Sequence, residues 1–291
     1  MIHRYKNNGY NIVLDVNSGS VHVVDDIVYD IVGCLEEKMS EAAILEKFKN
    51  QYKEEDIRTA IEECRELEEA QMLFTNDIYE NAIESFKDRP TVVKALCLHI
   101  AHDCNLACRY CFAEEGEYHG RRALMTYEVG KQALDFLIAN SGNRKNLEVD
   151  FFGGEPLMNW NVVKELVAYG RSQEKIHNKH FRFTLTTNGV LLDDDIMEFA
   201  NEEMDNVVLS IDGRKEVHDF MRPFRKGKGS YDLVVPKFQK FADSRGQQKY
   251  YARGTFTHHN LDFSEDVLHL ADLGFEQISV EPVVADEKEE Y

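Results

Sequence analysis

From Val92 onward, short apolar runs alternate with amphipathic stretches, and this alternation restricts the fold more than any other feature of the sequence. Strands that alternate with helices form βαβ units, whose strands lie parallel in one sheet. We therefore predict an α/β fold, either a partial (βα)6 barrel of the TIM type or an open doubly wound sheet. Thr126, Asp193 and Ser264 stand where the N-caps of three helices belong. The apolar runs lie at 92–100, 147–152, 181–187, 206–211, 249–257 and 276–284, and the amphipathic stretches at 126–140, 160–176, 193–203, 231–243 and 263–273.

The N-terminal part of the chain follows a different pattern. Tyr10 to Val16 and Val21 to Val24 are rich in β-forming residues, and the segment between them has the composition of a hairpin turn. Three stretches with helical spacing follow, around 27–35, 43–48 and 54–72. A hairpin followed by three helices is typical of a small winged-helix-like module. The predicted domains are residues 1–80 and 92–291, joined by a linker over 81–91 that ends in Asp88-Arg89-Pro90.

Charge and composition exclude several classes of protein. The chain has 53 acidic and 34 basic residues, a formal net charge of -19, which disfavours binding to the phosphate backbone of nucleic acids. No apolar run approaches the ~20 residues that a membrane-spanning helix needs. The N-terminus lacks the apolar core of a signal peptide. We therefore expect a cytoplasmic protein that has neither nucleic acid nor membrane as a partner.

Three of the six cysteines form a cluster that directly follows the first predicted strand of the second domain. Cys104, Cys108 and Cys111 have the spacing C-x3-C-x2-C. In a chain without a secretion signal, clustered thiols usually hold a metal. Three thiolates can bind three irons of a [4Fe–4S] cluster and leave the fourth iron open to another ligand. The alternatives are a closed zinc site, completed by His102 or His119, and cysteines that lie in the core without a metal.

The other cysteines give no metal spacing. Cys34 and Cys64 occupy apolar positions of predicted helices and are expected in the core. Cys97 lies in the first strand of the second domain, where we expect a buried position, and a thiol that faces a substrate is the alternative.

The cysteine loop resembles the signature of radical S-adenosylmethionine (SAM) enzymes. Tyr110 precedes the last cysteine and Phe112 follows it, and Gly153-Gly154-Glu155-Pro156 ends the second strand, where that superfamily has its GGEP motif. The resemblance implies a radical SAM barrel in which the three cysteines hold a [4Fe–4S] cluster and SAM occupies the open iron. It also implies that SAM is cleaved to methionine and a 5′-deoxyadenosyl radical, which abstracts a hydrogen atom from the substrate.

The GGEP motif supplies part of the SAM site that the resemblance implies. Gly153 and Gly154 would let the backbone approach the ligand because they lack Cβ atoms. Glu155 would accept a hydrogen bond from the SAM ammonium group, and Pro156 completes the motif. No protein side chain is assigned a catalytic role, because the cofactors carry the radical chemistry.

Other strand ends supply the rest of the implied SAM site. Ser210 would contact the ribose, and Arg222 would pair with the carboxylate of SAM, with Arg253 as the alternative. Tyr110 would offer its backbone to the adenine. For the segment Thr186 to Gly189, at the end of the third strand, an edge of the pocket and a plain turn are both open.

The N-terminal module resembles the peptide-recognition element of enzymes that modify ribosomally made peptides. There a leader peptide adds a strand beside the small sheet, here residues 10–24, and packs on the third helix, here 54–72. The alternative is a domain that only packs on the barrel. Across nearly the whole chain, the combination is most similar to the maturases that install thioether crosslinks in six-cysteine peptides (the SCIFF, or ranthipeptide, group). The resemblance implies a cysteine-rich precursor peptide with a leader as substrate, and an electron donor such as flavodoxin or ferredoxin.

The sequence departs from this family at its C-terminal end. The family normally carries a SPASM domain that binds two auxiliary [4Fe–4S] clusters, whereas this sequence ends at Tyr291 and has no cysteine beyond Cys111. We therefore expect a truncated chain, with auxiliary clusters only in a missing C-terminal domain. The alternative functions are another SPASM-type maturase, which forms sactionine or carbon–carbon links or matures a sulfatase, and a non-catalytic peptide-binding scaffold.

Overall fold

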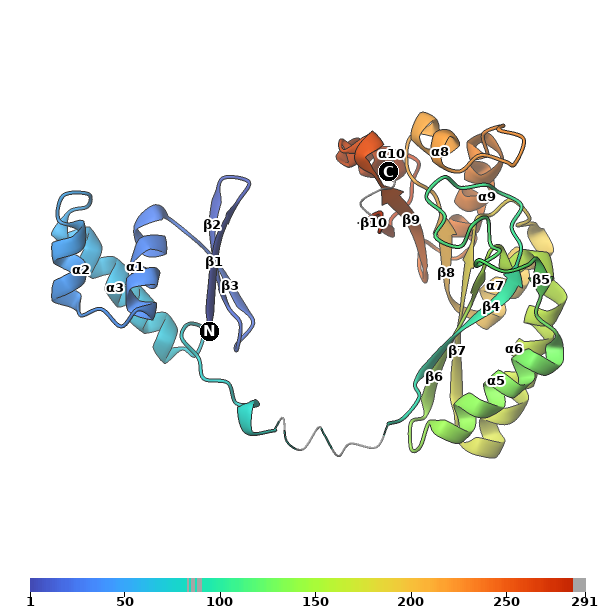
Figure 1. The fold of residues 1–291 in the computed structure, drawn as a ribbon, viewed down its shortest axis with the longest axis horizontal. Coiled ribbons are helices and arrows are strands. Elements are labelled where there is room, and N and C mark those ends of the chain that lie inside the picture. Colours follow the sequence, from blue (N-terminus) through green and yellow to red (C-terminus); the bar gives the residue numbers. More distant parts are fainter. Residues whose placement is uncertain (83, 85–86, 88–90, 285–291) are drawn as a thin grey trace. The chain divides into compact units, whose positions relative to one another are not determined.

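The computed structural model describes residues 1–82, 84, 87 and 91–284 and contains two compact units, Met1–Pro90 and Thr91–Tyr291 (Figure 1). Residues 83, 85–86 and 88–90, which include Asp88-Arg89-Pro90 of the predicted linker, lie outside the described residues. The same holds for the C-terminal segment 285–291, on which the expectation of a truncated chain depends.

The first unit contains a three-stranded antiparallel sheet and three helices. The strands are β1 (Ile2–Asn7), β2 (Tyr10–Asp15) and β3 (Ser20–Val24), in the order β1-β2-β3. The helices are α1 (Asp26–Glu36), α2 (Glu41–Phe48) and α3 (Glu54–Glu69), followed by the short 3-10 helix η1 (Glu80–Ala82). The predicted hairpin and helices are present, and β1 is an additional strand. The apolar pattern does not reveal β1 because Ile2 is its only buried residue.

The core of the first unit lies between the sheet and the helices. Ile31, Ile44 and Ile57 from the three helices are buried together with Val13 from β2. Cys34 and Cys64 are buried in the same core, as expected from their apolar helical positions. The side chain of Ser40 accepts a hydrogen bond from the Ala43 amide and caps α2.

The second unit is built on a seven-stranded sheet in the order β10-β9-β8-β7-β6-β4-β5. The parallel strands are β4 (Ala95–His102), β6 (Asn146–Gly153), β7 (His180–Thr187), β8 (Met204–Ser210), β9 (Tyr250–Phe256) and β10 (Ile278–Pro282), and the short β5 (Ala123–Leu124) is antiparallel at the edge. A doubly wound sheet reverses its strand order at a switch point. Here the parallel strands follow the chain order, which is the winding of a TIM-type barrel.

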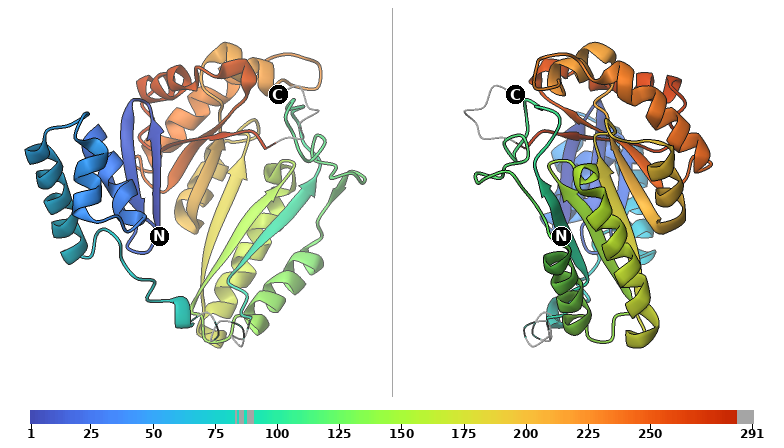
Figure 2. Two further views of the ribbon diagram at one scale, coloured as in Figure 1. Left: turned by 60° about the vertical axis from the view of Figure 1, so that its left-hand side comes forward. Right: turned by 90° about the vertical axis from the view of Figure 1, so that its right-hand side faces the viewer.

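Five longer helices cover one face of this sheet (Figure 2). They are α5 (Tyr127–Asn140), α6 (Trp160–His177), α7 (Asp194–Glu203), α9 (Tyr231–Ser244) and α10 (Phe263–Asp272). Thr126 and Asp193 accept N-capping hydrogen bonds, as predicted. The prediction that Ser264 is an N-cap is wrong, because α10 begins at Phe263 and Ser264 is its second residue. The residue at the N-cap position is Asp262, whose side chain pairs with Arg214 instead of capping the helix.

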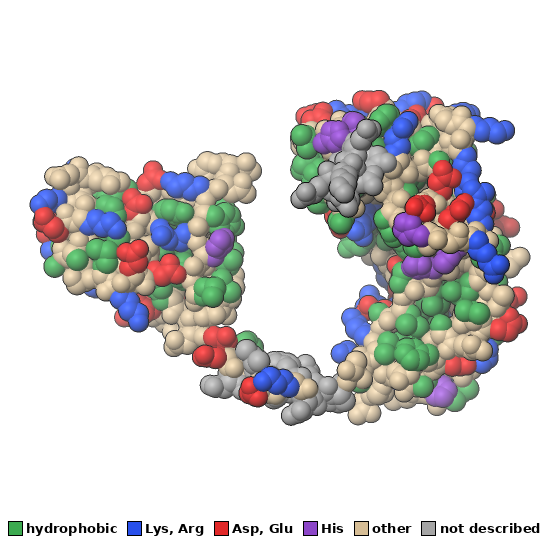
Figure 3. All heavy atoms as spheres, in the orientation of Figure 1, with side chains coloured by type: hydrophobic (Ala, Val, Ile, Leu, Met, Phe, Trp, Pro, Cys, Tyr) green, Lys and Arg blue, Asp and Glu red, His purple; other side chains and the backbone are tan. Residues whose placement is uncertain are grey.

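Helix α8 (Lys215–Met221) is not evident in the sequence pattern. It has only seven residues, and His218 and Met221 are its only buried side chains, so it shows little apolar periodicity. Among the described residues, no helix combines the length and apolar character that crossing a bilayer requires. Acidic, basic and hydrophobic side chains are interspersed on the visible face of each unit (Figure 3).

The sheet of the second unit has two unlike faces. Residues that point toward the helices, such as Phe151, Phe183 and Leu209, form the main core. Residues that alternate with them, such as Cys97 and Asp150, line a cavity of about 510 Å³ on the other face. The prediction that Cys97 is buried is therefore wrong, because strand alternation turns its exposed side chain away from the helices.

Candidate functional site

The cysteine loop follows β4 and is held by a segment that comes more than a hundred residues later in the chain. The amide of Ala107 donates to the carbonyl of Pro223 at 2.9 Å, and the amide of Arg109 donates to the carbonyl of Met221 at 2.9 Å. Next to the first of these hydrogen bonds, residues 106 and 224 form an antiparallel bridge. The segment after α8 thus fixes the backbone on which the three cysteines lie.

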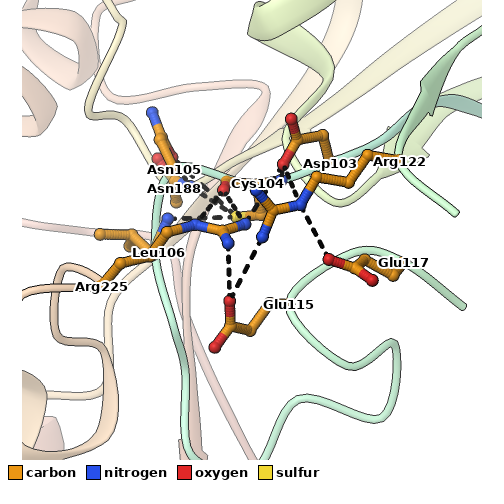
Figure 4. Close-up of polar contacts among 9 residues, drawn as sticks. All are labelled: Asp103, Cys104, Asn105, Leu106, Glu115, Glu117, Arg122, Asn188 and Arg225. Atoms are coloured by element: carbon orange, nitrogen blue, oxygen red, sulfur yellow. Dashed lines mark hydrogen bonds and ion pairs between the residues drawn. The ribbon is translucent and has the colours of Figure 1, made fainter.

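Charged side chains of this segment and of residues 115–122 reinforce the loop (Figure 4). The guanidinium of Arg225 donates to the carbonyl of Cys104 from Nη2 at 2.7 Å and from Nε at 3.1 Å. It also forms ion pairs with Asp103 at 3.2 Å and with Glu115 at 2.9 Å. Arg122 lies 3.5 Å from the same Asp103 carboxylate. Each partly exposed ion pair adds little stability alone, but together they connect the cysteine loop to two other segments.

The GGEP segment packs directly against the beginning of the cysteine loop. The amide of Gly154 donates to Ala101 O at 2.7 Å, and the amide of Glu155 donates to Asp103 O at 2.9 Å. A Cβ atom at Gly154 would overlap the Asp103 carbonyl, and one at Gly153 would overlap the Ala101 carbonyl. The close approach that we expected toward a ligand is therefore made by the chain's own backbone.

Glu155 is fully buried and joins the ends of two neighbouring strands. One carboxylate oxygen accepts from the Leu157 amide at 3.0 Å and from the Thr187 hydroxyl at 2.8 Å, and the other accepts from the Asn188 amide at 2.8 Å. Burial raises its pKa to about 7, although these hydrogen bonds favour the charged form. The structure thus gives this carboxylate three partners within the chain, and its contact with the SAM ammonium group stays a prediction. Pro156 begins the 3-10 helix η2 (Pro156–Asn159).

The turn after β7 belongs to the site, which the sequence pattern left open. Asn188 is buried, and its Nδ2 lies 2.8 Å from Asn105 Oδ1 and 3.5 Å from the sulfur of Cys104. The only signal for this contact in the sequence is the position of Thr187-Asn188-Gly189 at a strand end. Its partners are 83 and 84 residues away, so no local pattern contains them.

The buried Asp212 and the partly buried Arg222 and Tyr110 form a second group beside the cysteine loop. Asp212 Oδ2 lies 3.0 Å from Arg222 Nε, and both carboxylate oxygens accept from the Tyr110 hydroxyl, at 2.8 and 2.9 Å. Burial alone would lower the pKa of Arg222, but the Asp212 charge raises that pKa above its usual value. Burial raises the pKa of Tyr110 well above its usual range. Arg222 therefore has a counter-charge within the chain, and its pairing with the SAM carboxylate stays a prediction.

Ser210 and Arg253 lie opposite each other in the register of β8 and β9. Arg253 forms an ion pair with Glu281 on β10. Asp150 lies on the same open face of the sheet, and burial raises its pKa to about 6 while a hydrogen bond from Thr186 and the charge of Arg253 oppose the shift. Neither the ribose contact of Ser210 nor the alternative role of Arg253 follows from these contacts, and both stay predictions.

The residues of the loop suit an iron–sulfur cluster. Burial raises the pKa of the Cys108 thiol to about 11 and that of Cys104 further still, so metal binding would have to stabilise their thiolate forms. Asn105 Nδ2 is buried and, within the described part of the chain, has no hydrogen-bond acceptor. A cluster has sulfur acceptors that could satisfy this donor.

The alternative zinc site would need a fourth ligand beside the thiols. His119 pairs instead with Glu114 at 2.8 Å, and the ring of His102 lies against that of Tyr118 with centroids 4.8 Å apart. In the described ranges, no three His, Cys, Asp or Glu side chains converge as a single metal ion requires. A [4Fe–4S] cluster has a different requirement, because each thiolate binds a different iron.

Comparison with known proteins places the second unit among characterised families. The model of the Radical SAM superfamily matches residues 98–252. The radical SAM cyclopropyl synthase TigE of Paramaledivibacter caminithermalis is 26% identical over 162 residues, which cover 48% of this chain and 34% of that protein. A serine-type anaerobic sulfatase-maturating enzyme of Bacteroides thetaiotaomicron is 33% identical over 140 residues, which cover 45% of this chain and 32% of that enzyme. This chain spans less than half of the length of the curated relatives it matches.

Solved structures show the same fold. Native anSMEcpe with bound AdoMet and Cp18Cys peptide aligns with a TM-score of 0.60 and 20% identity over 69% of this chain and 54% of that chain. Streptococcus suis SuiB bound to S-adenosylmethionine aligns with a TM-score of 0.51 and 16% identity over 99% of this chain and 63% of that chain. The predicted α/β fold with a partial TIM-type barrel is confirmed.

Proposed function

The chain belongs to the radical SAM superfamily of enzymes, and from this premise we propose that it installs thioether crosslinks in a cysteine-rich, ribosomally made peptide. Its cofactors are a [4Fe–4S] cluster and SAM. When bound, they supply a 5′-deoxyadenosyl radical that abstracts a hydrogen atom from the substrate. The proposal includes an electron donor such as flavodoxin or ferredoxin, and a reducing cytoplasm in which the thiols remain available.

In this proposal, the chain's own residues hold and orient the cofactors. Cys104, Cys108 and Cys111 bind the cluster on a loop whose backbone is fixed by residues 221–225. The SAM-binding set is the one that the family resemblance implies. It consists of Tyr110, Gly153, Gly154, Glu155, Pro156, Ser210 and Arg222. The pairing of Tyr110 and Arg222 with the buried Asp212 supports this set, because groups held by such contacts keep their positions when a ligand arrives.

The first unit supports a peptide substrate. β3 is an edge strand of the small sheet, and its Val21 and Val23 are 62% and 66% exposed. An edge strand presents unpaired backbone groups to which an extended peptide can add as a further strand. One similar solved structure, that of anSMEcpe, contains a peptide together with AdoMet. The combination of this open edge with the cysteine loop in one chain is the observation that carries the proposal.

A second candidate function is the maturation of a sulfatase. The 33% identity to the Bacteroides enzyme favours it. Both reactions act on a polypeptide, but only the thioether reaction joins a cysteine sulfur to a carbon of the same peptide. The product therefore distinguishes them, because crosslinking removes two hydrogen atoms per bond and protects the thiol from alkylation.

The test begins with the cofactors. Protein reconstituted with iron and sulfide without oxygen, then reduced with dithionite, is expected to convert SAM to 5′-deoxyadenosine, and Cys108→Ala is expected to form none. Arg222→Ala is expected to lower SAM affinity while keeping the visible absorbance of the cluster. Arg253→Ala serves as the comparison, because it removes the alternative partner of the SAM carboxylate. Near-zero iron together with stoichiometric zinc would contradict the proposal.

The substrate is tested in a second step. A six-cysteine precursor peptide and a sulfatase-derived peptide are each incubated with the reduced enzyme and SAM, and the products are examined by mass spectrometry after alkylation. A product of the first peptide with fewer alkylated thiols supports thioether formation. Turnover of the sulfatase peptide alone favours the second candidate.

A further inference from the structure

Asn188 lies at the end of β7 with its amide group directed at the first cysteine of the loop (Figure 4). Its Nδ2 is 3.5 Å from Cys104 Sγ and 2.8 Å from Asn105 Oδ1. The residue is 7% exposed, so water does not compete freely for this donor. The sulfur of Cys104 also accepts from the amide of Leu106 at 3.5 Å.

The backbone fixes which end of the Asn188 amide faces the sulfur. The amide of Val190 donates to Asn188 Oδ1 at 3.1 Å. A backbone N–H can only donate, so the side-chain atom that it contacts is the oxygen. The NH2 group is therefore the end that faces Cys104, and Asn188 is a hydrogen-bond donor to the sulfur.

A buried carboxylate holds this donor in place. The Asn188 amide donates to Glu155 Oε2 at 2.8 Å, and the other oxygen of Glu155 accepts from Thr187 and Leu157. Glu155 belongs to the segment that packs on the start of the cysteine loop. The donor, its support and the acceptor thus belong to one hydrogen-bond network, buried at Glu155 and Asn188, which limits the motion of the Asn188 side chain.

We propose that Asn188 tunes the reduction potential of the cluster by donating a hydrogen bond to the Cys104 thiolate. The inference depends on Cys104 being a cluster ligand, and it does not depend on the identity of the substrate. Hydrogen bonds to the ligand sulfurs are among the factors that set cluster potentials. A donor N–H interacts more strongly with the sulfur when the cluster holds one more electron, so it stabilises the reduced state and makes the potential less negative.

The test is a redox titration of the reconstituted full chain, followed by electron paramagnetic resonance. Asn188→Ser removes Nδ2 but keeps a side-chain oxygen that can accept from Val190, and its midpoint potential is expected to be more negative than that of wild type. Asn188→Asp keeps the oxygen and adds a negative charge, so a larger negative shift is expected. Asn201→Ser is the matched control, because Asn201 bonds Ser244 on an exposed surface, and its potential should equal that of wild type.

Cys104→Ala tests the assignment on which the inference depends. It is expected to lose the cluster, and retention of wild-type iron would overturn the inference at that step. An unchanged potential in either iron-loaded Asn188 variant would overturn the tuning role. Loss of iron from both Asn188 variants would also overturn it, because the side chain would then act on assembly or folding rather than on the potential.

Discussion

Asp212 and Arg222 form a buried ion pair, with Oδ2 of the carboxylate 3.0 Å from Nε of the guanidinium. Asp212 follows the end of β8, and Arg222 lies in the segment that holds the cysteine loop. The Arg222 guanidinium also lies 5.3 Å from the ring centroid of Tyr110, a residue of that loop. The pair therefore joins the end of β8 to the cysteine loop through charge as well as through hydrogen bonds.

Removing one charge of this pair is expected to destabilise the second unit. Asp212→Asn leaves the guanidinium of Arg222 buried without a counter-charge, and the free energy of unfolding is expected to fall by about 3 kcal/mol. The measurement is urea unfolding followed by the fluorescence of Trp160, the only tryptophan of the chain, which lies in the second unit.

Asp262→Asn is the control for this change. Asp262 pairs with Arg214 at the surface, where solvent screens the charges, so loss of this ion pair is expected to lower the free energy of unfolding much less. An equal decrease in the free energy of unfolding in the two variants would show that the buried ion pair stabilises the unit no more than the surface pair does.

His218 is expected to make the second unit less stable in acid. The Asp212 amide donates to His218 Nδ1 at 3.4 Å, and His218 Nε2 lies 3.0 Å from Ser230 Oγ. The Ser230 hydroxyl donates its own proton to the carbonyl of Arg222. These contacts require the neutral ring with its proton on Nε2. Burial lowers the pKa of His218 from 6.5 to about 4.

The sign of the pH effect follows from this shift. Between pH 6.5 and about 4, His218 binds a proton in the unfolded chain but not in the folded chain. Its contribution to the free energy of unfolding is therefore fully present above pH 6.5 and is lost as the pH falls through this range. The contribution of this residue is about 3 kcal/mol. His218→Asn keeps an acceptor for the Asp212 amide and does not titrate, so its unfolding free energy should fall less across this range. Parallel pH profiles for the two proteins would contradict the prediction.

Gly154→Ala is expected to displace the cysteine loop. The new Cβ would overlap the carbonyl of Asp103, next to Cys104, and overpacking of this kind costs about 1–3 kcal/mol. The expected result is lower iron content after reconstitution together with a lower free energy of unfolding. Gly120→Ala is the control, because its nearest atom, Glu117 O, would be 3.4 Å away. Wild-type iron content in Gly154→Ala would show that the loop tolerates the displacement.

Local chemistry made part of this fold predictable from the sequence. Thr126 and Asp193 cap helices through hydrogen bonds to residues three positions later, and such pairs are visible in a short window. The strands of the second unit were predictable because the side chains on one of their two faces pack under helices and are therefore apolar. The superfamily was evident from the spacing of the cysteines and from the GGEP motif, which are also local patterns.

Contacts between distant segments were not predictable in this way. Glu155 is bonded to Asn188, 33 residues away, and Tyr110 is bonded to Asp212, 102 residues away. From the sequence alone, each of these polar residues could equally well lie at the surface. Only the packing of distant segments removes it from water. For Cys97 the prediction failed in the opposite direction. It was expected to be buried because it lies in an apolar strand, but its side chain is exposed.

The exposed edge of the first unit provides a test of peptide binding. Val23 on β3 is 66% exposed, and charged side chains on an edge strand oppose the addition of another strand. Val23→Lys is expected to weaken binding of the leader segment of a six-cysteine precursor peptide by about tenfold, which corresponds to about 1.4 kcal/mol. Fluorescence anisotropy of a labelled leader measures the affinity.

Formation of 5′-deoxyadenosine without peptide should not change, because the substitution lies outside the unit that contains the cysteine loop. Val129→Lys, at a 53% exposed position of α5, is the control and should bind the leader like wild type. Equal affinities for all three proteins would place leader binding elsewhere than at the β3 edge.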